Sequence, residues 1–150
     1  MRIQIIKLLF YVREYIIMLC DNLDNSGFIK DKLFHEGLAV SDCIFKENGI
    51  DLSVEIQNYL EKLILIFQYI KSNDIQKFNQ ADKEVKDTIA AFFGGKFPSM
   101  ERCRVAAGWF ENTDITYITD ELKKIMLFRA MKNYNAEQIT LDRLLIAILS

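Results

Sequence analysis

Very few residues in this chain have the types and spacing that catalysis requires. The only histidine is His35, so any nucleophile activated by an imidazole would have to use it, and no G-x-S-x-G turn is present. Lys32 and Glu36 lie close to it in an apolar segment, which is typical of a structural or surface histidine. We therefore predict that the chain is not an enzyme and has no small-molecule substrate.

The cysteines also give little support to a chemical site. Cys20, Cys43 and Cys103 are odd in number, far apart and without a Cys-x-x-Cys spacing. With a single histidine in the chain, they cannot complete a zinc site at motif spacing. We expect reduced, buried thiols in a cytoplasmic protein that holds no metal and no cofactor.

Carboxylates recur at helical spacing, as in Asp120 with Glu121 and Asp82 with Glu84. A two-metal site in a helical bundle also needs Glu-x-x-His motifs, and the sequence has none. The loop DNLDNSG weakly resembles a calcium-binding loop, but its glycine falls at the seventh place, where an EF-hand has it at the sixth. We interpret this loop as a turn.

Composition and charge exclude several classes of protein. The 21 acidic and 19 basic residues are spread evenly along the chain and give a net charge of −2, which argues against a nucleic-acid binder. Lys7, Arg13 and Glu14 interrupt the apolar N-terminal run well before the roughly 20 residues that a membrane span needs. An interfacial helix there is a minor alternative. The length of 150 residues predicts one domain, residues 1–150.

The apolar spacing predicts an all-α, compact bundle of about six or seven helices. The first helix covers residues 1–20, and the next covers 28–46, where Gly37 leaves open a division into two pieces. The most regular helix carries Ile56, Leu60, Leu63, Phe67 and Ile70, and we expect it at the centre. Three further stripes run through residues 75–92, 115–126 and 139–148, and a short helix is expected around 100–110. The apolar face over 75–92 holds Ile75, Phe78, Val85, Ile89 and Phe92, and its opposite face (Lys77, Asp82, Glu84, Lys86 and Asp87) is expected to be solvated surface; the last stripe holds Ile139, Leu144, Leu145 and Ile148.

Residues 90–109 (AAFFGGKFPSMERCRVAAGW) form the main break in this helical pattern. Gly94 and Gly95 can satisfy the last carbonyls of a helix, and Pro98 with Ser99 fits the start of a new turn. We expect the corner to pack on Trp109. A phosphate-binding loop does not fit, because a helix rather than a strand precedes the glycines.

The middle of the chain, residues 59–126, resembles a family of small helical bacterial proteins grouped with the immunity proteins of polymorphic and contact-dependent toxins. Their hallmark reads Phe-Gly-Gly-Met-Gly-Ser-Phe/Leu-Asn-Asp. Here Phe93, Gly94, Gly95, Ser99 and Met100 match it. The sequence departs from the hallmark at Lys-Phe-Pro, which is one residue longer than Met-Gly, and at Glu-Arg, which stands for Asn-Asp.

The resemblance implies a non-catalytic antitoxin that binds a cognate toxin domain, often a basic nuclease, and covers its active site. Acidic loop residues would then steer association with the toxin. Each of these acids also fits a helix cap or a turn, which is the commoner role. The alternatives are a helical regulatory or adaptor protein of viral or phage type, with a groove for a partner helix, and a small enzyme with a cleft. The predicted contact residues are Asp21, Asp24, Glu47, Asp51, Glu111 and Asp114.

Overall fold

All regular elements in the described part of the chain are helices. The computed structural model describes residues 2–24, 26–93 and 115–149. The predicted all-α class and the number of helices are confirmed, and the described ranges contain no strand. The predicted helix at 100–110 lies outside them. In chain order the helices are α1 (Arg2–Cys20), α2 (Ser26–Asn48), α3 (Ser53–Ser72), α4 (Ile75–Phe93), α6 (Ile115–Ala130) and α7 (Tyr134–Leu149).

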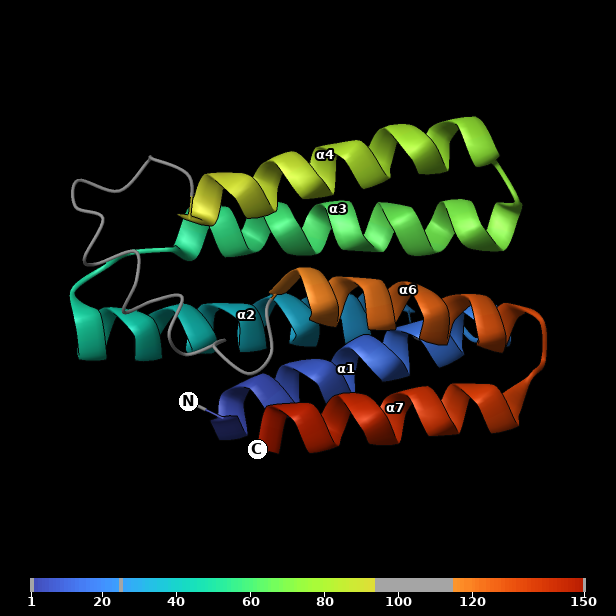
Figure 1. The fold of residues 1–150 in the computed structure, drawn as a ribbon, viewed down its shortest axis with the longest axis horizontal. Coiled ribbons are helices and arrows are strands. Elements are labelled where there is room, and N and C mark those ends of the chain that lie inside the picture. Colours follow the sequence, from blue (N-terminus) through green and yellow to red (C-terminus); the bar gives the residue numbers. More distant parts are fainter. Residues whose placement is uncertain (1, 25, 94–114, 150) are drawn as a thin grey trace.

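Neighbouring helices pair into three antiparallel hairpins: α1 with α2, α3 with α4, and α6 with α7 (Figure 1). The turns of all three hairpins lie at the same end of the molecule, which we call the turn end. Among the described residues, each turn contains one in the left-handed region: Asn22 at φ 55°, Asn73 at φ 56° and Lys132 at φ 59°. The helices therefore alternate in direction through the bundle, as in other bundles with short loops.

The most regular helix, α3, is central, as predicted. Leu60, Ile66 and Phe67 are fully buried; Leu60 and Phe67 share one side of the helix, whereas Ile66 points about 100° away from Phe67. α3 contacts α1, α2, α4 and α6. At its C-terminus Asn73 takes the left-handed conformation; its N–H donates to the Ile70 carbonyl at 3.2 Å, and the Asp74 N–H donates to the Tyr69 carbonyl at 3.1 Å. Asp74 then caps α4, because the Lys77 N–H donates to Asp74 Oδ1 at 3.1 Å.

A buried hydrogen bond joins α3 to α6. Tyr59 Oη and Thr119 Oγ1 are 2.7 Å apart. Thr119 donates its only hydroxyl proton to the Ile115 carbonyl at 2.7 Å, so Tyr59 must be the donor in the bond to Thr119. Burial raises the pKa of Tyr59 to about 12, and the phenol remains protonated well above neutral pH.

Helix α2 is continuous from Ser26 to Asn48, so Gly37 does not divide it. Gly37 is buried at the closest approach of α2 to α3. A Cβ at this position would lie 2.5 Å from Leu60 Cδ1 and 3.3 Å from Ile56 Cγ2. The glycine therefore serves helix packing.

Some apolar residues that the spacing assigned to buried faces are exposed. Ile75, the first residue of α4, is 67% exposed. Ile139 is 57% exposed, since it lies about 140° around α7 from the buried Leu144. Within the described ranges, no helix has the length and apolar content that crossing a lipid bilayer requires.

We predict that Gly37→Ala lowers the free energy of unfolding. Alanine gains about 1 kcal/mol of helix propensity over glycine, but the new methyl group must displace the fully buried Leu60 side chain. Overpacking of this kind costs about 1–3 kcal/mol, so the net change should be about −1 kcal/mol in urea denaturation.

The matched control is Gly27→Ala, near the start of the same helix. A Cβ on Gly27 would meet no atom within 4 Å, so this variant should be neutral or slightly more stable. Equal effects at positions 27 and 37 would contradict the close packing of α2 on α3.

Candidate functional site

The described acids predicted to contact a partner are divided between the two ends of the bundle. Asp21 and Asp24 lie at the turn end, whereas Glu47 and Asp51 lie in the α2–α3 connection at the opposite end (Figure 1). The length of α2, about 35 Å for 23 residues, separates the two pairs. These four acids therefore do not form one continuous surface.

Two of these acids also have structural partners. Asp21 Oδ2 accepts a hydrogen bond from Arg129 Nη2 at 2.8 Å. Asp51 Oδ1 accepts one from the Ser53 N–H at 2.9 Å, and hydrogen bonds from Ser53 lower the pKa of Asp51. The N-cap residue of α3 is Leu52, which makes no side-chain cap, so Asp51 is bonded to the first residue of the helix from a position just outside it. Two predicted contacts and the five residues of the predicted motif lie outside the described residues: Glu111, Asp114, Gly94, Gly95, Pro98, Ser99 and Trp109.

The histidine and the two described cysteines do not have the arrangement that a catalytic or metal site needs. His35 is exposed on α2, and Cys20 and Cys43 are free thiols. The Cys20 thiol lies 3.7 Å from Met126 Sδ, and burial raises its pKa, which opposes formation of the reactive thiolate. In the ranges that the structure describes, no group of three His, Cys, Asp or Glu residues could hold a metal ion.

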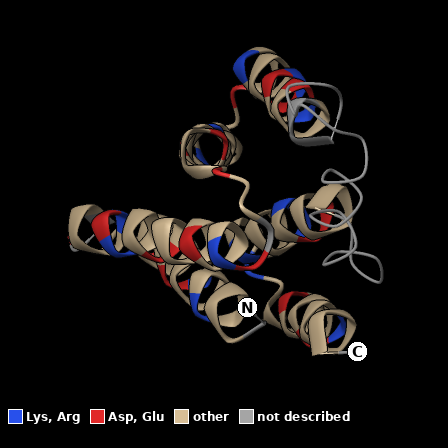
Figure 2. Cartoon of the chain, turned by 90° about the vertical axis from the view of Figure 1, so that its left-hand side faces the viewer, with Lys and Arg blue, Asp and Glu red and all other residues tan. Residues whose placement is uncertain are grey.

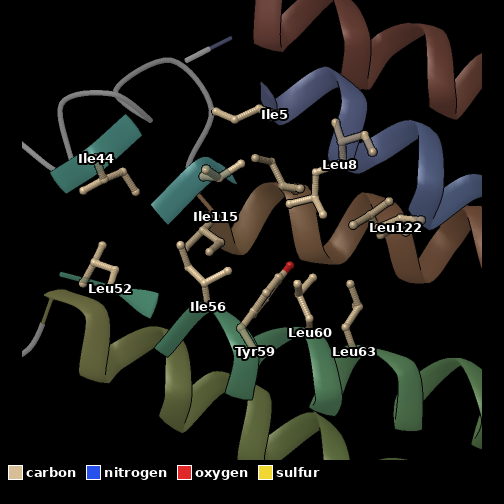
Figure 3. A pocket seen from close by; sticks show the side chains of 14 residues that line it. Ile5, Leu8, Ile44, Leu52, Ile56, Tyr59, Leu60, Leu63, Ile115 and Leu122 are labelled. Carbon is tan, nitrogen blue, oxygen red and sulfur yellow. The ribbon is translucent and has the colours of Figure 1, made fainter. Parts of the chain in front are cut away.

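An apolar cavity of about 80 Å³ lies between α1, α2, α3 and α6 (Figure 3). Its described lining is aliphatic apart from Tyr59, whose hydroxyl is bonded to Thr119. No ionisable carboxylate or amine of the described residues lines it. Side chains such as Leu8, Ile56 and Leu122 can exclude water, but they offer no proton donor, acceptor or nucleophile.

A second hollow is a groove between α4 and α6, with the C-terminal part of α3 beneath it. In Figure 1, α4 and α6 lie on either side of α3, and the groove volume is about 460 Å³. Ile75 from α4 and Leu127 from α6 line it and are 67% and 46% exposed. The other lining residues are Tyr69, Ile70, Asn73, Asp74, Phe78, Asp120, Lys123 and Lys124.

Lys123 joins the two walls of this groove. Its ammonium group lies 2.7 Å from Asp82 of α4 and 3.0 Å from Asp120 of α6, and Asp82 also contacts Lys86 at 3.0 Å. Burial disfavours the charge on Asp82, but hydrogen bonds from Lys123 and Lys86 outweigh it and lower the pKa of this carboxyl. Burial likewise opposes the charge on Lys123, and the two aspartates more than compensate, so its pKa is raised.

The face of α4 that the sequence assigned to solvent is therefore partly engaged between helices. Asp82 reaches Lys123 on α6, and Glu84 lies 2.7 Å from Lys62 on α3. The spacing of charges along α4 could not show this, because the partners belong to other helices. Lys77, Lys86 and Asp87 are exposed, as predicted.

Glu121, next to the groove wall, is a buried acid with two cationic partners. Its side chain is only 4% exposed. Arg143 of α7 lies 2.7 Å from Oε2, and Lys124 lies 3.0 Å from Oε1. Burial opposes ionisation, but the hydrogen bonds from Arg143 and Lys124 outweigh it and lower the pKa of Glu121. The carboxylate therefore stays charged and links α6 to α7.

A similar link lies at the turn end. Glu137 of α7 has a 3% exposed side chain, and its Oε2 is 3.3 Å from Arg129 Nη1. Among the described groups its other oxygen has no hydrogen-bond partner. Arg129 also holds Asp21 and lies 4.8 Å from the ring centre of Tyr134. This one arginine thus connects α6, α7 and the turn after α1.

Sequence reasoning missed these buried acids, although one signal for Glu121 was available. Glu121 falls between Ile118 and Ile125 at intervals of three and four, so it shares their buried helix face. A carboxylate on such a stripe needs a cation from a neighbouring helix. Which cation supplies it depends on packing, which periodicity does not give.

Figure 2 shows that basic and acidic positions are interspersed along the described helices. No protein-family model, no curated protein and no solved structure matches this chain. Among the described hollows, the groove between α4 and α6 has the size and the mixed apolar and charged lining that best fit the binding of another molecule.

We predict that Arg129→Met lowers the free energy of unfolding by about 3 kcal/mol, because it leaves the buried Glu137 carboxylate without a cation. Adding Glu137→Met should recover at least half of this loss, since an apolar pair replaces the uncompensated charge. Urea denaturation followed by circular dichroism measures both changes.

Lys124→Met is the matched control, and it should cost less than about 1 kcal/mol, because Arg143 still neutralises Glu121. A double variant no more stable than Arg129→Met would contradict the pairing of Arg129 with Glu137.

We also predict acid destabilisation from Asp82 and Glu121. Their folded pKa values lie below the ordinary values of 3.8 and 4.5, so the unfolded chain binds more protons in acid. The stability they contribute is present above about pH 4.5 and is lost as pH falls through the folded pKa values.

Urea denaturation from pH 6 to pH 2.5 measures this loss. The variant Asp82→Asn/Glu121→Gln should lose less stability over that range than the wild type. The control is Glu61→Gln at an exposed position of α3, and it should follow the wild-type curve.

Proposed function

We propose that this chain is a non-catalytic protein that binds another protein through the groove between α4 and α6. The observation that carries the proposal is the groove itself, a hollow of about 460 Å³ in which Ile75 and Leu127 are exposed. Large apolar side chains gathered at a concave surface are typical of protein-binding sites. Proteins that recognise a partner helix use grooves of this kind.

The ionisation of the groove also favours binding over catalysis. A general acid or base works best with a pKa near the operating pH. The pKa of Asp82 is lowered and that of Lys123 is raised, so both move away from neutrality. These groups act as fixed charges that can orient a partner.

We propose further that the partner is a cognate bacterial toxin domain, which this chain neutralises as an immunity protein. The support is the resemblance of residues 59–126 to toxin-immunity proteins, together with a groove at the turn end. The exposed Asp24 lies at that same end. A basic nuclease would complement this acid while its apolar residues enter the groove.

A helical adaptor is the second candidate, and the groove favours it specifically. An adaptor would hold an amphipathic helix without inhibiting any enzyme. In contrast, the four described loop acids, which are divided between opposite ends of the bundle, do not form one acidic plug. The two functions differ in whether binding protects a cell from a toxin.

We predict that Ile75→Glu and Leu127→Glu each weaken partner binding at least about tenfold, as expected of apolar anchors in an interface. The chain would be co-expressed with a candidate toxin domain, chosen as one encoded by a neighbouring gene, and binding measured by co-purification and calorimetry. Growth of the cells reports neutralisation. Both side chains are exposed, so stability should change by less than about 0.5 kcal/mol.

Val54→Glu is the matched control, because Val54 is 65% exposed but lies at the other end of α3. Binding without growth protection would favour the adaptor. Binding that survives both groove substitutions would contradict the proposed site. Unchanged binding after reversing the charges of Asp21, Asp24, Glu47 and Asp51 would exclude these four loop acids as contacts.

A further inference from the structure

We infer that the groove between α4 and α6 holds an amphipathic helix of the partner that carries a basic and an acidic side chain one turn apart, placed against Asp120 and Lys124. This inference rests on the proposed function, because it specifies which part of the partner the groove binds. It follows from the ion pairs of Asp120 and Lys124 on α6, because the charged group that each of them contacts has a second partner.

The apolar part of the groove sets the kind of segment that fits. Tyr69 and Phe78 are half-buried at its base, and Ile75 and Leu127 are exposed at its sides. From Ile75 to Asp82, where the contact with Lys123 joins the walls, α4 rises about 11 Å, or two helical turns. Two turns of an amphipathic helix present apolar residues at i, i+3 or i+4, and i+7, enough to cover this surface.

Lys124 can bind a partner carboxylate without leaving a buried charge alone. Its side chain is 52% exposed, and its ammonium lies 3.0 Å from Glu121. If Lys124 turns to a partner, Glu121 keeps Arg143 at 2.7 Å. The usual penalty for removing one member of a buried ion pair is therefore avoided.

Asp120 can bind a partner cation for the same reason. Its side chain is 50% exposed, and its carboxylate lies 3.0 Å from Lys123. If Asp120 turns to a partner, Lys123 keeps Asp82 at 2.7 Å. Both half-exposed groups on the α6 wall thus belong to clusters in which the buried member has a second partner.

The spacing of these two groups defines the complementary ligand. Asp120 and Lys124 are four residues apart on α6, about 6 Å along its axis. A helix alongside α6 meets both when it carries a base and an acid at i and i+4. The order of the two charges then sets the direction of the bound helix, parallel or antiparallel to α6.

The test uses stapled, fluorescein-labelled 14-residue helical peptides with leucine at i, i+3, i+4 and i+7. One peptide carries a Lys/Glu pair at two other positions, j and j+4, on the flank of the leucine face; the others carry Gln/Gln, Lys/Lys or Glu/Glu at j and j+4. Fluorescence anisotropy with the full chain gives each Kd. We expect the Lys/Glu peptide to bind about 3- to 10-fold more tightly than the Gln/Gln peptide, and the like-charged peptides to bind more weakly than the Lys/Glu peptide.

The variant Asp120→Asn/Lys124→Gln should bind the Lys/Glu and Gln/Gln peptides equally, since only the apolar contacts remain. Lys83→Gln/Asp87→Asn, at exposed positions of α4, should keep the full preference. If the double variant in the groove melts early, the single substitutions serve, and each should remove about half of the preference. The preference should also shrink between 0.05 and 0.5 M NaCl.

A Lys/Glu peptide that binds no better than Gln/Gln, or a preference that survives in Asp120→Asn/Lys124→Gln, would overturn this inference. If Ile75→Glu still weakens binding of the partner protein in that case, the proposed function stands and only the charge pairing fails. If partner capture is insensitive to Ile75→Glu and no peptide binds, both fail.

Discussion

The burial of α3 is the constraint on which the rest of this structure depends. Leu60 and Phe67 point to one side of the helix and Ile66 points to another, and all three are removed from water. Each fully buried side chain of this size is worth about 1.5–3 kcal/mol, so partners have to surround α3. α1, α2, α4 and α6 meet that need together.

The groove is a consequence of this arrangement. α4 and α6 both pack on α3, but they contact each other much less than either contacts α3. Between them, Lys123 of α6 is bound to Asp82 of α4. An ion pair of this kind fixes the relative positions of the two helices and leaves the neighbouring apolar surface open.

Much of the fold could be predicted from the sequence, because the responsible signals are local. The spacing from Ile56 to Ile70 indicates a helix, and Asn73 with Asp74 marks a helix end and a new start whatever packs around them. The roles of Gly37, Glu121 and Ile75 could not be predicted in this way. Each depends on which helix lies opposite, and that is decided by tertiary packing.

The candidate site was less predictable still. The loop acids can be picked out by residue type, but the direction of α2 decides that Asp24 and Glu47 end up far apart. The groove has no sequence signature, because its residues come from three helices. Only the contacts in the structure reveal that Asp120 and Lys124 share their partners with other charges.

The pairing of consecutive helices also bears on how the chain is made. Short turns keep the entropy cost of closing each hairpin low, so each pair can form soon after its second helix is synthesised. α1, however, contacts α6 and α7 as well as α2 and α3. During translation, one flank of the first helix must stay uncovered until the last two helices have left the ribosome.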